Sequence, residues 1–167
     1  ILKYWKISLI SSAIGTIIGI LPGAGAPVAS LLAYDSAKKY ARKPKIPFGQ
    51  GAPEGIAASE SANNACIGGA LVPMLTLGIP GDAVTAVMLS AFYVHGLRPG
   101  PLFIKENPQA FELIVLSTLI GSFFIIVLGF LFIPVLSKVV LVPKKIMLPL
   151  IAILCIIGAY SVNSSLY

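Results

Sequence analysis

Charged residues are scarce in this sequence. They make up 11% of its 167 residues, whereas an average soluble domain carries about 25%. A globular protein with so few charges has too little polar surface to cover itself in water. Its apolar runs are also long enough to cross a bilayer, which takes about 20 helical residues. We therefore predict an all-α integral membrane protein.

Residues that build metal and catalytic sites are equally scarce. The chain has one histidine and two cysteines, without the spacing of a metal site or of a nucleophile motif. Gly49-Gln50-Gly51 lacks the third glycine and the lysine of a phosphate-binding loop. We expect no metal, no cofactor and no enzyme activity. Cys66 and Cys155 both lie in apolar surroundings and are interpreted as small core residues rather than a disulfide.

Basic residues outnumber acidic ones by 12 to 6, but they lie in short clusters between apolar runs. No cluster is interleaved with aromatic residues, as a nucleic-acid groove would be, so we expect no nucleic-acid partner. Clusters of this kind set the orientation of membrane proteins. The bias places the loops at 38–45 and 138–145 in the cytoplasm and the loop at 98–112 outside. An odd number of crossings must then separate Lys45 from Arg98.

The chain divides into apolar segments and polar loops. We predict a broken helix or hairpin at 7–40, a cytoplasmic loop at 41–53, a discontinuous segment at 54–97, an outer loop at 98–110, and transmembrane helices at 111–133 and 146–162. Pro134 is expected to close the helix that precedes it. In the first segment, a kinked span and a re-entrant hairpin both fit, and the lysines at each end mildly favour the hairpin.

Two helix breaks share the same chemistry. Residues 21–25 read LPGAG and residues 78–81 read GIPG, and neither can continue a regular helix. Irregular backbone at membrane depth survives only inside protein or beside a water-filled cavity. Each break is followed by a new helix, whose first N–H groups suit an anionic ligand. Paired interrupted segments indicate the binding site of a transporter. The alternative is a pair of proline kinks that serve packing. The candidate binding residues are Pro22, Gly23, Ala24, Gly25, Pro80 and Gly81.

A polar cluster, SESANN at 59–64, lies between the breaks. On a helix, Glu60, Asn63 and Asn64 share one face. We assign Ser61, Asn63 and Asn64 to substrate binding, and Glu60 and Asn63 to a coupling cation. The alternatives are hydrogen bonds between membrane helices or an interfacial position.

Other polar residues allow two interpretations each. Asp82 is either the N-cap of the following helix or, with Thr85, a ligand of the coupling cation. His95 and Arg98 are interpreted as interfacial. Gly15 and Gly19 have the spacing of close helix packing.

The blocks ILPGAGAPVASLLAY (20–34), FGQGAPEGIAASESANNACIGGALVPMLTLGIPGDAVTAVMLSAF (48–92) and HGLRPGPLF (95–103) resemble the large membrane subunit of tripartite tricarboxylate transporters. GAYSVNSSLY at the end resembles a later stretch of that subunit. The full subunit is about three times as long, so the chain looks like part of its second half.

The resemblance implies a multi-pass permease of the bacterial inner membrane that imports citrate-like carboxylates. It implies coupling to Na⁺ or H⁺ and an inverted-repeat secondary transporter fold. It also implies two partners, a small membrane subunit and a periplasmic substrate-binding protein. Two other classes stay open from the residues alone. One is a structural subunit that scaffolds a partner, and the other is an intramembrane enzyme using Glu60 or Asp82.

Overall fold

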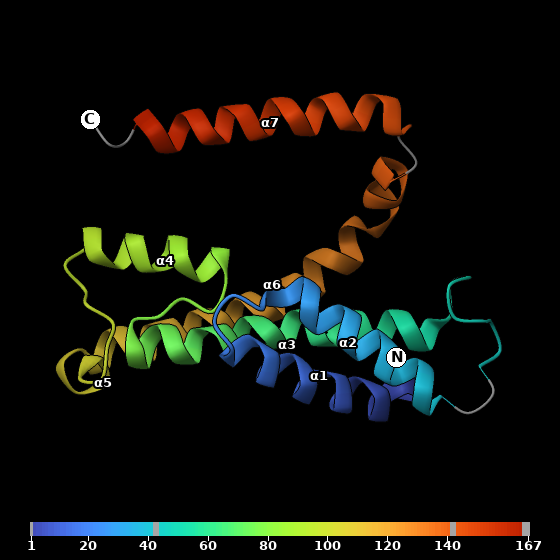
Figure 1. Ribbon diagram of the computed structural model, residues 1–167, viewed down its shortest axis with the longest axis horizontal. Helices are drawn as coiled ribbons and strands as arrows, with labels where there is room; N and C mark the ends of the chain where they lie inside the picture. Colours follow the sequence, from blue (N-terminus) through green and yellow to red (C-terminus); the bar gives the residue numbers. More distant parts are fainter. Residues whose placement is uncertain (1, 42–43, 141–142, 165–167) are drawn as a thin grey trace. The chain divides into compact units, whose positions relative to one another are not determined.

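The computed structural model describes residues 2–41, 44–140 and 143–164, and these form helices and loops with no strand among them. The all-helical prediction is thereby confirmed. The chain forms two compact units, Ile1–Glu112 and Leu113–Tyr167. In chain order (Figure 1), the elements are η1 (Leu2–Tyr4), α1 (Trp5–Ile20), α2 (Gly25–Tyr40), α3 (Pro53–Leu77), α4 (Ala83–Val94), α5 (Phe103–Glu106), α6 (Pro108–Val140) and α7 (Lys144–Ser164).

In the first unit, α1 and α2 form a hairpin that packs against α3 (Figure 1). The start of α1 and the end of α2 line one pocket, so both arms run to the same end of α3. The first segment is therefore a hairpin rather than one kinked span.

Small residues four positions apart form the contact surfaces of these three helices. The buried positions are Ser11, Gly15 and Gly19 on α1, Gly25, Ala29, Ala33 and Ala37 on α2, and Ala58, Ala62, Cys66 and Ala70 on α3. A spacing of four keeps such residues on one helix face. Small side chains let the helix backbones approach closely, as in membrane helix pairs.

The crossing of α1 and α3 leaves no room for larger side chains. A Cβ atom added at Gly15 would lie 2.2 Å from the carbonyl oxygen of Ala62, and one added at Gly69 would lie 2.3 Å from that of Thr16. Only glycine fits at such positions. The packing role predicted for Gly15 and Gly19 is confirmed.

The chain doubles back after α3. Gly78 ends this helix in the left-handed conformation, with φ of 70°, which glycine adopts readily. Gly81 then lies against Ala70, whose Cα is 2.8 Å from a Cβ placed at Gly81. α4 therefore starts level with the inner part of α3. The N–H of Gly100 donates to the carbonyl of Leu75, which brings the loop after α4 to the C-terminal end of α3.

Within the predicted discontinuous segment at 54–97, α3 and α4 lie on either side of the break at 78–81. α3 is one continuous helix of 25 residues with Pro73 inside it. Its buried alanines favour a helix and also pack against α1 and α2.

The second unit contains α7 and most of α6. The stretch Pro108–Val135 of α6 is long and apolar enough to cross a membrane. The prediction that Pro134 closes this helix was wrong, since α6 continues to Val140. A proline inside a helix removes one hydrogen bond, here the one that would reach the carbonyl of Phe130. Membrane helices tolerate such a loss because hydroxyl side chains, water or neighbouring helices can serve the freed carbonyl.

The two cysteines differ in their surroundings. Cys66 is buried in the core of the first unit, as predicted. Cys155 is exposed on α7, so its assignment to a core was wrong for the described residues. Its neighbours Leu154 and Ile156 are exposed as well. This apolar surface of α7 is therefore a face toward lipid or toward another part of the protein rather than an internal core.

Candidate functional site

The two helix breaks meet in the folded chain. The backbone N–H of Gly23 donates to the carbonyl of Gly81 across 2.9 Å. Asp82 lies beside the first residue of α2, since a Cβ added at Gly25 would be 3.8 Å from the Cβ of Asp82. The starts of α2 and α4 therefore border one site.

The first break is a tight turn set by glycine and proline. The N–H of Leu21 donates to Ile18 and that of Ala24 donates to Leu21. Gly23 and Gly25 have φ of 82° and 68°, values that residues with a side chain rarely adopt. No side chain caps the start of α2. Its first N–H groups, together with the positive end of the helix dipole, are left for another acceptor.

The second break fits only a glycine at position 81. A Cβ there would lie 2.7 Å from both the Cβ of Ala70 and the carbonyl oxygen of Gly19. The adjoining α4 is capped, unlike α2. The Thr85 N–H donates to Asp82 Oδ1 at 2.8 Å, and the Asp82 N–H donates to the Thr85 hydroxyl oxygen at 2.9 Å. Asp82 is therefore the N-cap of α4, in a reciprocal capping box.

The capping box uses one oxygen of the Asp82 carboxylate, Oδ1, and leaves the other for a ligand. The Thr85 hydroxyl also donates to Oδ1, at 2.7 Å. Both Thr85 bonds therefore converge on one oxygen of Asp82, and the side chain of Asp82 lines the cavity beside the breaks. Thr85 itself is buried. Its hydroxyl is thus committed to the cap, whereas Asp82 carries a negative charge at the cavity edge.

The cavity at the paired breaks has a volume of about 530 Å³. Its lining is small and mostly apolar, and Asp82 is the only ionisable residue among the described residues that line it. The lining residues are Gly23, Gly25, Ala26, Pro27, Pro80, Asp82, Ala83, Val84 and Ala86. The sequence did not predict five of these residues, which are Ala26, Pro27, Ala83, Val84 and Ala86. Their position in the first turn of a helix after a break is the signal that identifies them.

The polar cluster of α3 does not line this cavity. Glu60, Asn63 and Asn64 are exposed on one face, as their spacing predicted. The opposite face, with Ala58 and Ala62, packs against α1 and α2. The amide of Asn64 donates to the carbonyl of Glu60 at 2.9 Å.

The remaining predicted site residues are dispersed. Ser61 is partly buried, whereas Pro22 lies exposed in the first turn and outside the cavity lining. Ala24 occupies the N-cap position of α2. His95 and Arg98 follow α4 and are exposed. The structure thus brings together the two breaks and Asp82, but not the asparagines.

A comparison with protein families identifies the chain. The model of the "Tripartite tricarboxylate transporter TctA family" matches residues 1–167. The chain belongs to the TctA family of tripartite tricarboxylate transporters. This is a transporter family rather than an enzyme family. The resemblance found in the sequence blocks is confirmed by this match.

Two relatives of this TctA-family chain come from Agrobacterium vitis. One is described as an "Uncharacterized 52.8 kDa protein in TAR-I ttuC' 3'region" and is 39% identical over 152 residues, covering 91% of the chain and 30% of the relative. The other, an "Uncharacterized protein in TAR-II ttuC' 3'region", is 38% identical over 151 residues, covering 90% of the chain and 62% of the relative. The chain therefore spans less than two thirds of either relative. No solved structure matches it.

Proposed function

We propose that this chain is part of the permease subunit of a cation-coupled tripartite uptake system for citrate-like carboxylates. The observation that carries the proposal is the hydrogen bond from Gly23 to Gly81, which places two helix starts at one cavity. Membership of a tricarboxylate transporter family supports the substrate class. Helix starts exposed by broken helices are the anion sites of several secondary transporters.

In this proposal the substrate carboxylate accepts hydrogen bonds from the uncapped first turn of α2. The partial positive charge at that helix start favours an anion. The backbone N–H groups of Gly25 and Ala26 would supply the donors, since the N–H of Ala24 already donates to Leu21 and Pro27 has no N–H. Gly23, Pro80 and Gly81 would shape the cavity so that the ligand approaches the backbone.

The carboxylate of Asp82 would repel an anionic substrate in the same cavity. A coupling cation, Na⁺ or H⁺, placed at Asp82 removes that repulsion, so cation and substrate bind best together. Thr85 fixes the orientation of Asp82 through the capping box. The proposal thus gives coupling a local electrostatic cause.

The exposed polar face of α3 would complete the site from another part of the permease. Ser61, Asn63 and Asn64 are assigned to substrate, and Glu60 and Asn63 to the cation. An exposed row of asparagines beside a carboxylate is expensive against lipid. We infer that this face meets protein or a water-filled path.

The same proposal places the chain in the bacterial inner membrane as a multi-pass protein. The apolar stretch of α6 and the exposed apolar surface of α7 support this placement. The partners would be the small membrane subunit and the periplasmic binding protein of the tripartite system.

The test is uptake by the full-length complex in proteoliposomes, with its binding protein outside and a panel of di- and tricarboxylates. We expect uptake of at least one carboxylate that requires the binding protein and an inward gradient of Na⁺ or H⁺. Uptake that is equally fast with and without a Na⁺ or H⁺ gradient would contradict the proposed cation coupling. An assembled complex that moves no carboxylate would contradict the proposed function.

A scaffold subunit is distinguished from a permease by the prolines of the two breaks. If the chain only scaffolds, Pro22→Ala and Pro80→Ala lower the yield of complex, and whatever assembles transports normally. If it is the permease, Pro80→Ala also changes substrate affinity, because Pro80 lines the cavity. Pro22 lies outside the lining and serves as the comparison.

A further inference from the structure

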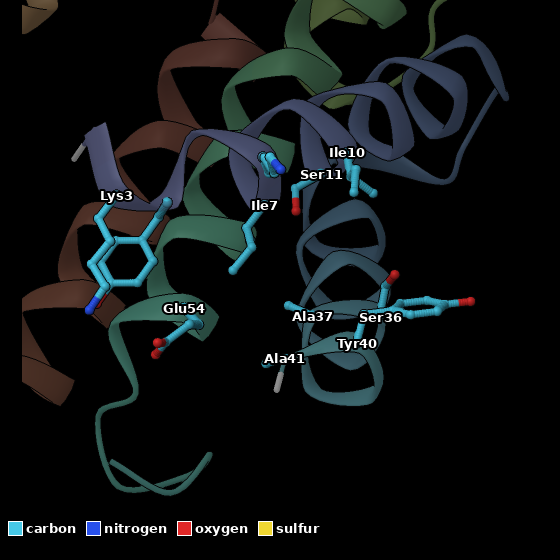
Figure 2. A pocket seen from close by; sticks show the side chains of 11 residues that line it. Lys3, Ile7, Ile10, Ser11, Ser36, Ala37, Tyr40, Ala41 and Glu54 are labelled. Atoms are coloured by element: carbon cyan, nitrogen blue, oxygen red, sulfur yellow. The ribbon is translucent and has the colours of Figure 1, made fainter. Parts of the chain in front are cut away.

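The open end of the α1–α2 hairpin holds a second pocket, of about 380 Å³. The starts of α1 and α3 and the end of α2 enclose it, and Figure 2 shows Lys3, Ser11, Ser36 and Glu54 around it. It lies at the opposite end of the hairpin from the paired breaks. It is therefore separate from the proposed substrate site.

This end of the hairpin carries the residues typical of a membrane interface. The ammonium of Lys3 lies 5.7 Å from the ring centre of Tyr4, and that of Lys6 lies 5.6 Å from the ring of Trp5. Lysine and amphipathic aromatic residues gather at the level of lipid headgroups. Lys3, Tyr4 and Lys6 all line the pocket, so it presents two cations at that level.

Glu54 gives the pocket its distinctive feature. It lies in the first turn of α3, where a negative charge suits the helix dipole. Its Oε2 atom is shielded from solvent, and no donor among the described residues bonds to it. A shielded carboxylate oxygen without a donor is costly. Glu54 also lines the pocket, so its carboxylate favours a ligand that brings a donor and a positive charge.

The pocket thus offers two cations for an anion and one carboxylate for a donor. We propose that it binds the headgroup of phosphatidylethanolamine. The phosphate would lie at Lys3 and Lys6, and the ammonium would donate to the carboxylate of Glu54. The pocket side of α1 also carries Ile10, which is more than half exposed, and an acyl chain would lie along it. This inference rests on the membrane placement of the proposed function.

Other lipids match the pocket less well. Phosphatidylcholine has the phosphate, but its quaternary ammonium has no N–H to donate. Phosphatidylglycerol has the phosphate, but neutral hydroxyl groups replace the ammonium, so it brings no positive charge to Glu54. A comparison of these three headgroups on identical acyl chains therefore separates the contribution of the two lysines, which would hold the phosphate, from that of Glu54, which would accept from the ammonium.

The experiment is mass spectrometry of the intact, detergent-purified full-length complex, titrated with each of the three lipids. We expect phosphatidylethanolamine to bind about tenfold more tightly than phosphatidylcholine, the effect of one charged hydrogen bond. Glu54→Gln should bring the two lipids to similar affinities. Lys3→Gln with Lys6→Gln should weaken both by roughly thirtyfold. None of these measurements requires transport, so they stand apart from the uptake test.

Lys38→Gln is the matched control, since Lys38 is exposed at the same end of the hairpin but does not line the pocket. Lys39 is less suitable because its hydrogen bond to Asp35, 2.7 Å long, raises its pKa and occupies its head group. Equal binding of the three lipids by the wild type would overturn the inference. So would tighter binding of phosphatidylglycerol, or no bound lipid, which would mean that another protein segment fills the pocket.

Discussion

The amide of Gly23 and the carbonyl of Gly81 are joined by a 2.9 Å hydrogen bond although they lie 58 residues apart in the sequence. This bond satisfies two backbone groups of otherwise irregular segments. It also fixes the start of α2 beside the start of α4. Any change that separates the two breaks should disturb both helix starts together.

The closeness of α1 and α3 can be tested with two neighbouring glycines. A Cβ at Gly69 would lie 2.3 Å from the carbonyl oxygen of Thr16, whereas one at Gly68 meets nothing within 4 Å. Overpacking of this kind costs about 1–3 kcal/mol. We expect Gly69→Ala to lower the thermal unfolding midpoint of the full-length protein in detergent by several degrees.

Gly68→Ala is the control for that change and should leave the midpoint unchanged or slightly raised, because alanine favours a helix over glycine. Equal midpoints for Gly68→Ala and Gly69→Ala would show that α1 and α3 do not cross this closely.

Two substitutions of Asp82 distinguish its role as a helix cap from its proposed role at the cation site. Asparagine caps a helix as well as aspartate does, whereas alanine loses about 1 kcal/mol. We expect Asp82→Asn to keep the stability of the wild type but to raise the cation concentration needed for half-maximal uptake. Asp82→Ala should lose both. If the Asp82→Asn variant reaches half-maximal uptake at the same cation concentration as the wild type, Asp82 acts only as a helix cap.

The exposed asparagines of α3 give a test of the second part of the site. We expect Asn63→Ala and Asn64→Ala each to lower uptake at limiting substrate about tenfold, the effect of one hydrogen bond to a charged group. Thr76→Ala is the comparison on the same helix, since the Thr76 hydroxyl donates to the carbonyl of Val72 in its own helix. Uptake at the wild-type level in both asparagine variants would remove this face from the site.

The sequence predicted the breaks better than the course of the chain between them. Proline and glycine interrupt a helix through local chemistry, so the helix breaks at LPGAG and GIPG could be predicted directly from the sequence. The starts of α2 and α4 follow from the same local rule. The reversal of the chain from Gly78 to Gly81 could not be read, since it depends on the contact with Ala70 and Gly19.

The packing of α3 against α1 and α2 could have been predicted from the sequence. Ala58, Ala62 and Cys66 form a four-residue repeat of small side chains, and such a repeat predicts a helix contact face. The roles of Asn63 and Asn64 are a different case, since both side chains are exposed and no described residue of this chain packs over them to show what they bind.

The measurement that bears most directly on the paired breaks is carboxylate binding to the assembled full-length permease carrying Gly25→Ala or Gly81→Ala. Gly81→Ala adds a methyl group that meets Ala70 and Gly19 at 2.7 Å, whereas Gly25→Ala adds one with ordinary contacts of 3.6 Å to Pro27 and 3.8 Å to Asp82. We predict that each variant weakens binding about tenfold or more, while Gly68→Ala binds like the wild type. Wild-type affinity in assembled Gly25→Ala and Gly81→Ala would contradict the account.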